Sequence, residues 1–271
     1  MALSVVDLYK SILPRTNCKD CGFPTCLAFA GMVVSEKLPL KNCPHIAPDL
    51  LEKSQKELDE QYAAGKWLKK DMAKDALIWA KERSASMNIA DLPERIGGEL
   101  LKEDGNPVLK LPYFKGFVII KSEGVFSAED VSLNRWEQVF IYNHIAQGGK
   151  AMPTGKWKGL EEIPNTVSKM KSMKSHVEEP LIKRFQGRME ELREAAVNLG
   201  GADMSREIPS AEIVFFFRPL PKLPVMLLFW DQEEGFEAKA KLLFDETITE
   251  HLDIESIMFL SERLRQLLCE T

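Results

Sequence analysis

The sequence has no apolar run that approaches the ~18 residues of a membrane-spanning helix, so no membrane span is predicted. It also has no basic excess, because 36 lysines and arginines are set against 41 aspartates and glutamates. Nucleic-acid-binding proteins usually carry a basic stripe, which argues against a nucleic-acid partner. The opening MALSVVDLYKSILPR is too short, and too acidic at Asp7, for a secretory signal. We therefore expect a cytoplasmic protein.

Several catalytic motifs are missing as well. The chain contains no Gly-rich phosphate loop, no G-x-S-x-G nucleophile turn and no H-E-x-x-H zinc motif. Cys269 has no base nearby in the sequence that would make it a nucleophile. We assign no catalytic residue, and the sequence indicates an electron-transfer or binding protein more than an enzyme.

Cysteine is scarce but clustered. Of five cysteines, four lie in the first 43 residues, in the spacing C-x2-C-x4-C-x16-C: Cys18, Cys21, Cys26 and Cys43. In a reducing compartment, clustered thiols are more often metal ligands than disulfides. We therefore interpret the segment as a metal site.

The spacing favours an iron–sulfur cubane, which needs one thiolate for each of its irons. A C-x2-C pair supplies two ligands from one turn, and Gly22 lets the backbone pass close to the inorganic sulfides. Cys26 lies in the first turn of a predicted helix, whose free N–H groups favour negative charge. Structural zinc sites usually present two matched ligand pairs, whereas here one pair precedes two single cysteines. Zinc and a disulfide stay open as alternatives.

Residues 14–46, PRTNCKDCGFPTCLAFAGMVVSEKLPLKNCPHI, resemble the N-terminal [4Fe–4S] domain of the large subunit of the corrinoid iron–sulfur protein. The resemblance lies in the thiol spacing, the CGFPTCLAFA string and the Cys-Pro-His ending. It implies Cys18, Cys21, Cys26 and Cys43 as ligands of one [4Fe–4S] cluster that transfers single electrons in anaerobic metabolism. It also implies a redox protein partner, with a corrinoid protein among the candidates. A corrinoid bound by this chain is not supported, because the Asp-x-His-x-x-Gly signature is absent.

We predict an α+β fold with a small, mostly antiparallel sheet, because helices and strands do not alternate as regular βαβ units. The expected organisation is a cluster domain over 1–47, a helical linker over 48–67 and an α+β domain over 68–271. From about residue 70 the chain resembles an uncharacterised family of anaerobic bacteria and archaea. Stretches such as GGKAMPTGKWKGLEEIP carry that resemblance, which implies no activity.

Within the α+β part, we expect a helix from a Ser132 cap to Gln147, a loop over 150–175 and one helix over 180–199. A hairpin of 211–218 with 224–230, a third strand over 239–245 and a last helix capped by Asp253 complete the expectation.

Three functional hypotheses follow. In the first, one [4Fe–4S] cluster relays single electrons to a partner. In the second, a cluster or zinc ion only stabilises the fold of a binding or regulatory protein. In the third, an enzyme site in the second domain uses Arg218, Asp231, Glu234 and His251, and requires those side chains to converge.

Overall fold

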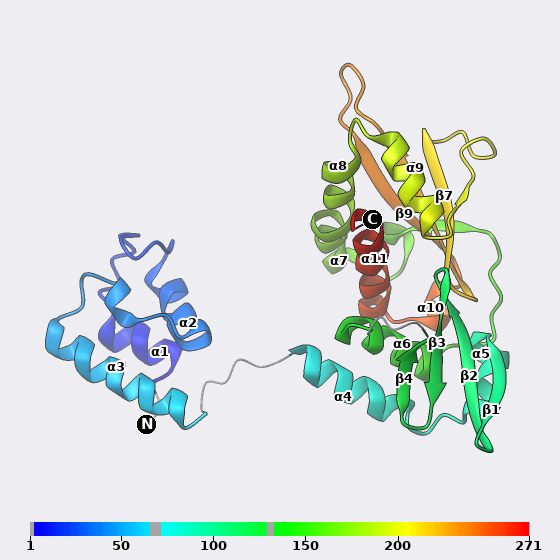
Figure 1. The fold of residues 1–271 in the computed structure, drawn as a ribbon. Coiled ribbons are helices and arrows are strands. Elements are labelled where there is room, and N and C mark those ends of the chain that lie inside the picture. Colours follow the sequence, from blue (N-terminus) through cyan, green and yellow to red (C-terminus); the bar gives the residue numbers. More distant parts are fainter. Residues whose placement is uncertain (1–2, 66–71, 129–132, 271) are drawn as a thin grey trace. The chain divides into compact units, whose positions relative to one another are not determined.

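The computed structural model describes residues 3–65, 72–128 and 133–270. The chain separates into two compact units, Met1–Met72 and Ala73–Thr271, which we call the N-terminal and C-terminal units. The first is helical, and the second combines helices with small antiparallel sheets (Figure 1). The predicted α+β class is therefore confirmed, and the sequence-derived domain boundaries stay a prediction.

The N-terminal unit consists of short helices around one core. Its elements are α1 (Val5–Asp7), η1 (Leu8–Ile12), α2 (Cys26–Glu36), η2 (Leu40–Asn42) and α3 (Pro48–Ala63). Ser4 caps α1 in a capping box with Asp7, as the sequence predicts.

The core of this unit is apolar. Leu8, Phe29, Leu40 and Leu58 are completely buried, and Leu58 comes from α3. Tyr62 of α3 donates its hydroxyl hydrogen bond to the Val33 carbonyl of α2 at 2.6 Å. The helix expected between the domains therefore packs on the cysteine-bearing segment.

The C-terminal unit contains two antiparallel sheets. The first is a meander in the order β1-β2-β3-β4, and the second has the order β5-β9-β8-β7-β6. Their strands are β1 (Glu99–Glu103), β2 (Asn106–Tyr113), β3 (Gly116–Lys121), β4 (Gly124–Ser127), β5 (Trp157–Gly159), β6 (Ala202–Asp203), β7 (Ile213–Leu220), β8 (Leu223–Trp230) and β9 (Lys239–Asp245). The predicted hairpin and third strand are confirmed as β7, β8 and β9.

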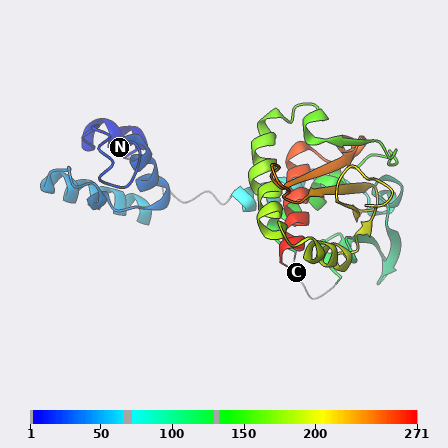
Figure 2. The ribbon, with the colours of Figure 1, turned by 90° about the horizontal axis from the view of Figure 1, so that it is seen from above.

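Helices cover one face of the five-stranded sheet, as Figures 1 and 2 show for α8 and α11. The helices of the C-terminal unit are α4 (Met72–Ser84), η3 (Ile89–Asp91), α5 (Leu92–Ile96), α6 (Arg135–Gln147), η4 (Leu160–Glu162), α7 (Val167–Met173), η5 (Lys174–Glu178), α8 (Glu179–Phe185), α9 (Met189–Asn198), α10 (Ile248–His251) and α11 (Ile254–Cys269). Asp253 accepts from the Ser256 N–H and caps α11, as predicted.

The five-stranded sheet is apolar on both faces. Along β7, Phe215 and Phe217 point into the main core under the helices, while Val214 points into a smaller cluster on the other face. That second cluster includes Trp157 and Trp230. Because successive side chains alternate between faces, the strand is hydrophobic at nearly every position.

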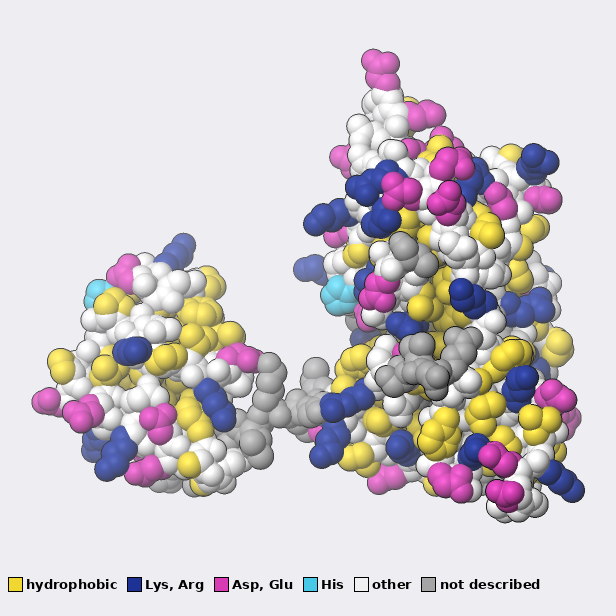
Figure 3. All heavy atoms as spheres, in the orientation of Figure 1, with side chains coloured by type: hydrophobic (Ala, Val, Ile, Leu, Met, Phe, Trp, Pro, Cys, Tyr) yellow, Lys and Arg dark blue, Asp and Glu magenta, His cyan; other side chains and the backbone are white. Residues whose placement is uncertain are grey.

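The four-stranded sheet has an outer face with exposed apolar side chains, and Figure 3 shows hydrophobic side chains gathered over it. Leu101, Phe117 and Phe126 are between 38% and 46% exposed. The Lys110 ammonium group lies 4.1 Å from the centre of the Phe117 ring.

Three sequence expectations are corrected by the structure. Ser132 lies outside the described residues, and the cap of α6 is Asn134, whose side chain accepts from the Glu137 N–H. The segment 150–175, expected to be a loop, contains β5, η4 and α7. The single helix expected over 180–199 is two, α8 and α9, because Gly187 takes a φ of 70° between them.

None of the described helices is long and apolar enough to span a bilayer.

Candidate functional site

The loop that carries the first two cysteines has an unusual backbone. Arg15, Asn17 and Lys19 adopt left-handed conformations with φ of 60°, 51° and 69°, and Gly22 follows with 84°. Such conformations cost about 1–3 kcal/mol each outside glycine, and they cluster at functional sites. No protein atom lies within 4 Å of a Cβ placed on Gly22, so its positive φ, and not crowding by the protein, explains the glycine.

Cys26 is fixed at the start of α2 by two side chains. Thr25 is the N-cap residue, and its hydroxyl accepts from the Ala28 N–H at 3.1 Å. The Asn17 side-chain oxygen accepts from the Cys26 N–H at 2.8 Å. Asn17 therefore ties the cysteine loop to the helix terminus.

The four thiols differ in their exposure. Cys18 is exposed and Cys21 is partly exposed, whereas Cys26 and Cys43 are each only 5% exposed. Burial raises the pKa of the Cys43 thiol, and the negative charges of the other three cysteines raise it further. The backbone N–H of His45 donates to Cys43 and opposes that rise. Cys43 is thus close enough to the other three cysteines to be affected by their charge.

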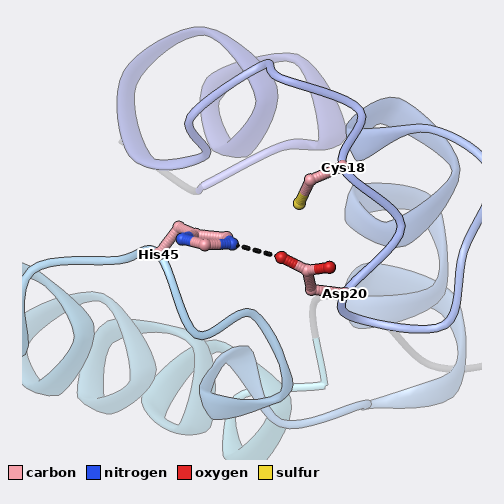
Figure 4. Close-up of side chains that lie close together, drawn as sticks. All are labelled: Cys18, Asp20 and His45. Carbon is pink, nitrogen blue, oxygen red and sulfur yellow. Dashed lines mark hydrogen bonds and ion pairs between the residues drawn. The ribbon is translucent and has the colours of Figure 1, made fainter.

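A polar cluster lies beside the exposed thiol (Figure 4). The Nε2 atom of His45 is 2.6 Å from an Asp20 carboxylate oxygen, and both side chains are about half exposed. Hydrogen bonds from His45 and from Cys18 lower the pKa of Asp20. The ligand atoms of Cys18, Asp20 and His45 all lie within 4.8 Å of one another.

The donor set fits a thiophilic metal centre. Four thiols, of which two are shielded from water, offer the soft ligands that iron–sulfur clusters and zinc both accept. The structure does not bring any three of the four thiols within 4.8 Å of one another.

The residues of the proposed enzyme site do not converge. In the β7–β8 hairpin, Phe217 pairs with Val225, which places Arg218 at the end opposite Asp231. About six residues of strand separate the two positions, roughly 20 Å. Asp231 instead accepts from the Gly187 N–H at 2.9 Å. The structure therefore contradicts the third hypothesis.

His251 is a buried structural residue. It is completely buried, and its Nε2 atom lies 3.0 Å from the Ala151 carbonyl. Its ring centre is 5.7 Å from that of His144, which is also completely buried. Burial lowers the pKa of His144 to about 3. The pair holds α10 against α6.

A groove of about 1460 Å³ lies in the C-terminal unit. Its walls carry charges of both signs, among them Lys174, Glu178 and Lys241. Burial raises the pKa of Glu178, while Lys241 lowers it. The mixed charge does not point to one class of ligand.

The sequence analysis missed two residues of the N-terminal site. Asp20 and Asn17 each lie next to a cysteine, and their side chains contact His45 and the Cys26 N–H. An asparagine next to a cysteine in a turn is a local signal for a contact like that of Asn17, because Asn tolerates a left-handed backbone and its side chain can bond to nearby backbone groups. The contact of Asp20 with His45 spans 25 residues, and no local pattern indicates it.

Comparison with known families agrees with the two units. The family model "Domain of unknown function (DUF3786)" matches residues 88–267, which is more than half of the chain. The chain belongs to this family. A second model, "Putative Fe-S cluster", matches residues 13–45, which include all four clustered cysteines. The N-terminal segment is therefore an iron–sulfur domain in front of a DUF3786 domain, in agreement with both sequence resemblances.

Curated relatives match over the N-terminal region. The acetyl-CoA decarbonylase/synthase complex subunit gamma of Methanocaldococcus jannaschii is 40% identical over 58 residues, 21% of this chain and 12% of the relative. The corrinoid/iron-sulfur protein large subunit of Moorella thermoacetica is 47% identical over 47 residues, 17% of this chain and 10% of the relative. The chain thus spans only about a tenth of either relative. No solved structure matches.

We expect Asn17 to stabilise the first turn of α2 and to slow the exchange of its amide hydrogens. We expect Asn17→Ala to lose the hydrogen bond to Cys26 and to strain the left-handed backbone, at a cost of about 2–4 kcal/mol. Asn17→Gly should lose the hydrogen bond alone and cost less. Hydrogen–deuterium exchange of peptides covering 18–30 in the full chain measures both. Equal protection in wild type and Asn17→Ala would show that the contact is not stabilising.

His144 should make the C-terminal unit sensitive to acid. Its folded pKa of about 3 lies below the ordinary 6.5, so the unfolded chain takes up a proton first as the pH falls. Its contribution is fully present above pH 6.5 and is lost toward pH 3, at about 1.4 kcal/mol per pH unit. Urea unfolding from pH 7 to 4 should therefore show a shallower pH slope in His144→Gln than in wild type.

The matched control is His176→Gln. His176 is 60% exposed, and solvent screens its 3.2 Å contact with Glu262, so its removal should change the pH slope less than His144→Gln does. Parallel slopes for wild type and His144→Gln would contradict the assignment of acid sensitivity to the buried histidine.

Proposed function

We propose that the N-terminal unit binds one [4Fe–4S] cluster through Cys18, Cys21, Cys26 and Cys43 and exchanges single electrons with a protein partner. The observation that carries this proposal is the placement of the four cysteines in one helical unit, with Cys26 and Cys43 in its core and Cys18 on its surface. The match to an iron–sulfur family model over 13–45 supports it. When bound, such a cluster takes up and releases one electron at a time.

The protein's own residues are suited to this role. Cys26 and Cys43 lie in the apolar core and shield one side of the site from water. The N–H of His45 donates to Cys43, and hydrogen bonds to ligand sulfurs are one of the features that set a cluster's potential. Cys18 lies on the exposed side, which leaves a short path for electrons to a docked partner.

A purely structural cluster or zinc ion is the competing interpretation. Structural metal ions are typical of domains too small to build a sufficient hydrophobic core. The N-terminal unit has an apolar core with Leu8, Phe29, Leu40 and Leu58 completely buried. A core of this kind argues against a metal whose only role is to hold the domain together.

The partner is proposed to be another redox protein. One relative is named as a subunit of the acetyl-CoA decarbonylase/synthase complex and another as a corrinoid/iron-sulfur protein. A corrinoid protein is therefore the first acceptor to test. The charge balance of the chain, with 41 acidic and 36 basic residues, does not favour nucleic acid.

Anaerobically purified full-length protein should show one reversible one-electron step in a redox titration followed by electron paramagnetic resonance (EPR). Reduction should produce a paramagnetic signal that integrates to about one spin per chain. Cys26→Ser and Cys43→Ser should lose that signal, and Cys269→Ser, outside the cluster segment, should keep it. A protein that carries iron and sulfide but shows no reversible step would refute electron transfer and leave a structural cluster.

A further inference from the structure

The thiols of the proposed cluster differ in their exposure to solvent. Cys26 and Cys43 are each 5% exposed, whereas Cys18 is the exposed member. Oxidation and alkylation of cysteine follow exposure and thiolate character. The ligand most readily lost is therefore Cys18.

A second anionic donor lies directly beside that thiol. A carboxylate oxygen of Asp20 lies within 4.8 Å of the Cys18 sulfur. His45 holds the other side of the same carboxylate, with 2.6 Å between Nε2 and Oδ2. All three ligand atoms lie within 4.8 Å of one another, and they point toward one another in Figure 4.

We infer that Asp20 is a reserve ligand for the iron that Cys18 holds, and that His45 keeps its carboxylate in position. The inference rests on the proposed function. When Cys18 is unavailable, an iron–oxygen bond to Asp20 replaces the iron–sulfur bond. No electron is transferred, and one singly charged anion replaces another, so the charge of the centre does not change.

The local chemistry suits this exchange. Carboxylates are established ligands of protein-bound iron. The Asp20 side chain is 52% exposed and has room to rotate. It follows Cys18 by two residues in a tight turn closed by the hydrogen bond from the Gly22 N–H to the Lys19 carbonyl, which keeps it close.

The test compares Cys18→Ala with Cys18→Ala/Asp20→Ala in the full chain, each purified without oxygen. Cys18→Ala should keep about four irons per chain and give no EPR signal when oxidised, as expected for a four-iron cluster. The double variant should lose about one iron and become paramagnetic when oxidised, as a three-iron cluster is. Cys18 and Asp20 are both exposed, so neither substitution should disturb the core. Circular dichroism checks that the helices are still formed in each variant.

The matched control is Cys18→Ala/Asp49→Ala, which removes an exposed aspartate in the first turn of α3. It should behave like Cys18→Ala. If Cys18→Ala and Cys18→Ala/Asp20→Ala bind the same amount of iron, Asp20 is not a reserve ligand. If Cys18→Ala/His45→Ala loses the iron and the Asp20 double variant keeps it, His45 is the ligand and the assignment is wrong.

The iron and sulfide content of the wild-type protein shows whether a failed test refutes this inference or the proposed function. Wild type without iron or sulfide would refute the cluster itself. Wild type with about four irons, together with indistinguishable Cys18 and Cys18/Asp20 variants, would refute only the role of Asp20.

Discussion

The candidate site depends on one hydrogen bond, from the Cys26 N–H to the Asn17 side chain. It joins a loop with left-handed residues at Arg15, Asn17 and Lys19 to the first turn of α2. The strain of that loop is tolerated because α2 is itself anchored, with Phe29 completely buried and Tyr62 bonded to Val33. The core therefore fixes the positions of the two buried thiols, Cys26 and Cys43.

The C-terminal unit is stabilised by different features. Its five-stranded sheet is buried on both faces, and its buried polar groups are tied into the fold. His144 and His251 bond to backbone carbonyls, and Glu137 links Tyr113, Arg263 and the cap of α6. These groups explain stability, and they do not assemble a catalytic constellation among the described residues.

Periodicity and turn chemistry in the sequence predicted most of the fold. The β7–β8 hairpin, β9, α2 and the Asp253 cap are recoverable because alternation, proline and capping residues are local signals. The break between α8 and α9 was missed because the apolar period continues through Gly187. The helices in 160–173 were missed because glycine and proline suggested a loop.

The candidate site was only partly predictable. The cysteine spacing identified an iron–sulfur segment, which the family match confirms, because ligand spacing is a property of the sequence. The contact between Asp20 and His45 depends on how Cys43-Pro44-His45 returns to the loop, and only the folded chain shows it. The supposed convergence of Arg218 with Asp231 failed because strand register sets them at opposite ends of a hairpin.

The central claim is that four thiolates each hold one iron of a single cluster. X-ray absorption at the iron edge, on the full chain purified without oxygen, tests it most directly. The account predicts about four irons per chain, sulfur-only coordination of the iron and a short iron–iron scattering path. Zinc in place of iron, or iron with no neighbouring metal, would contradict it.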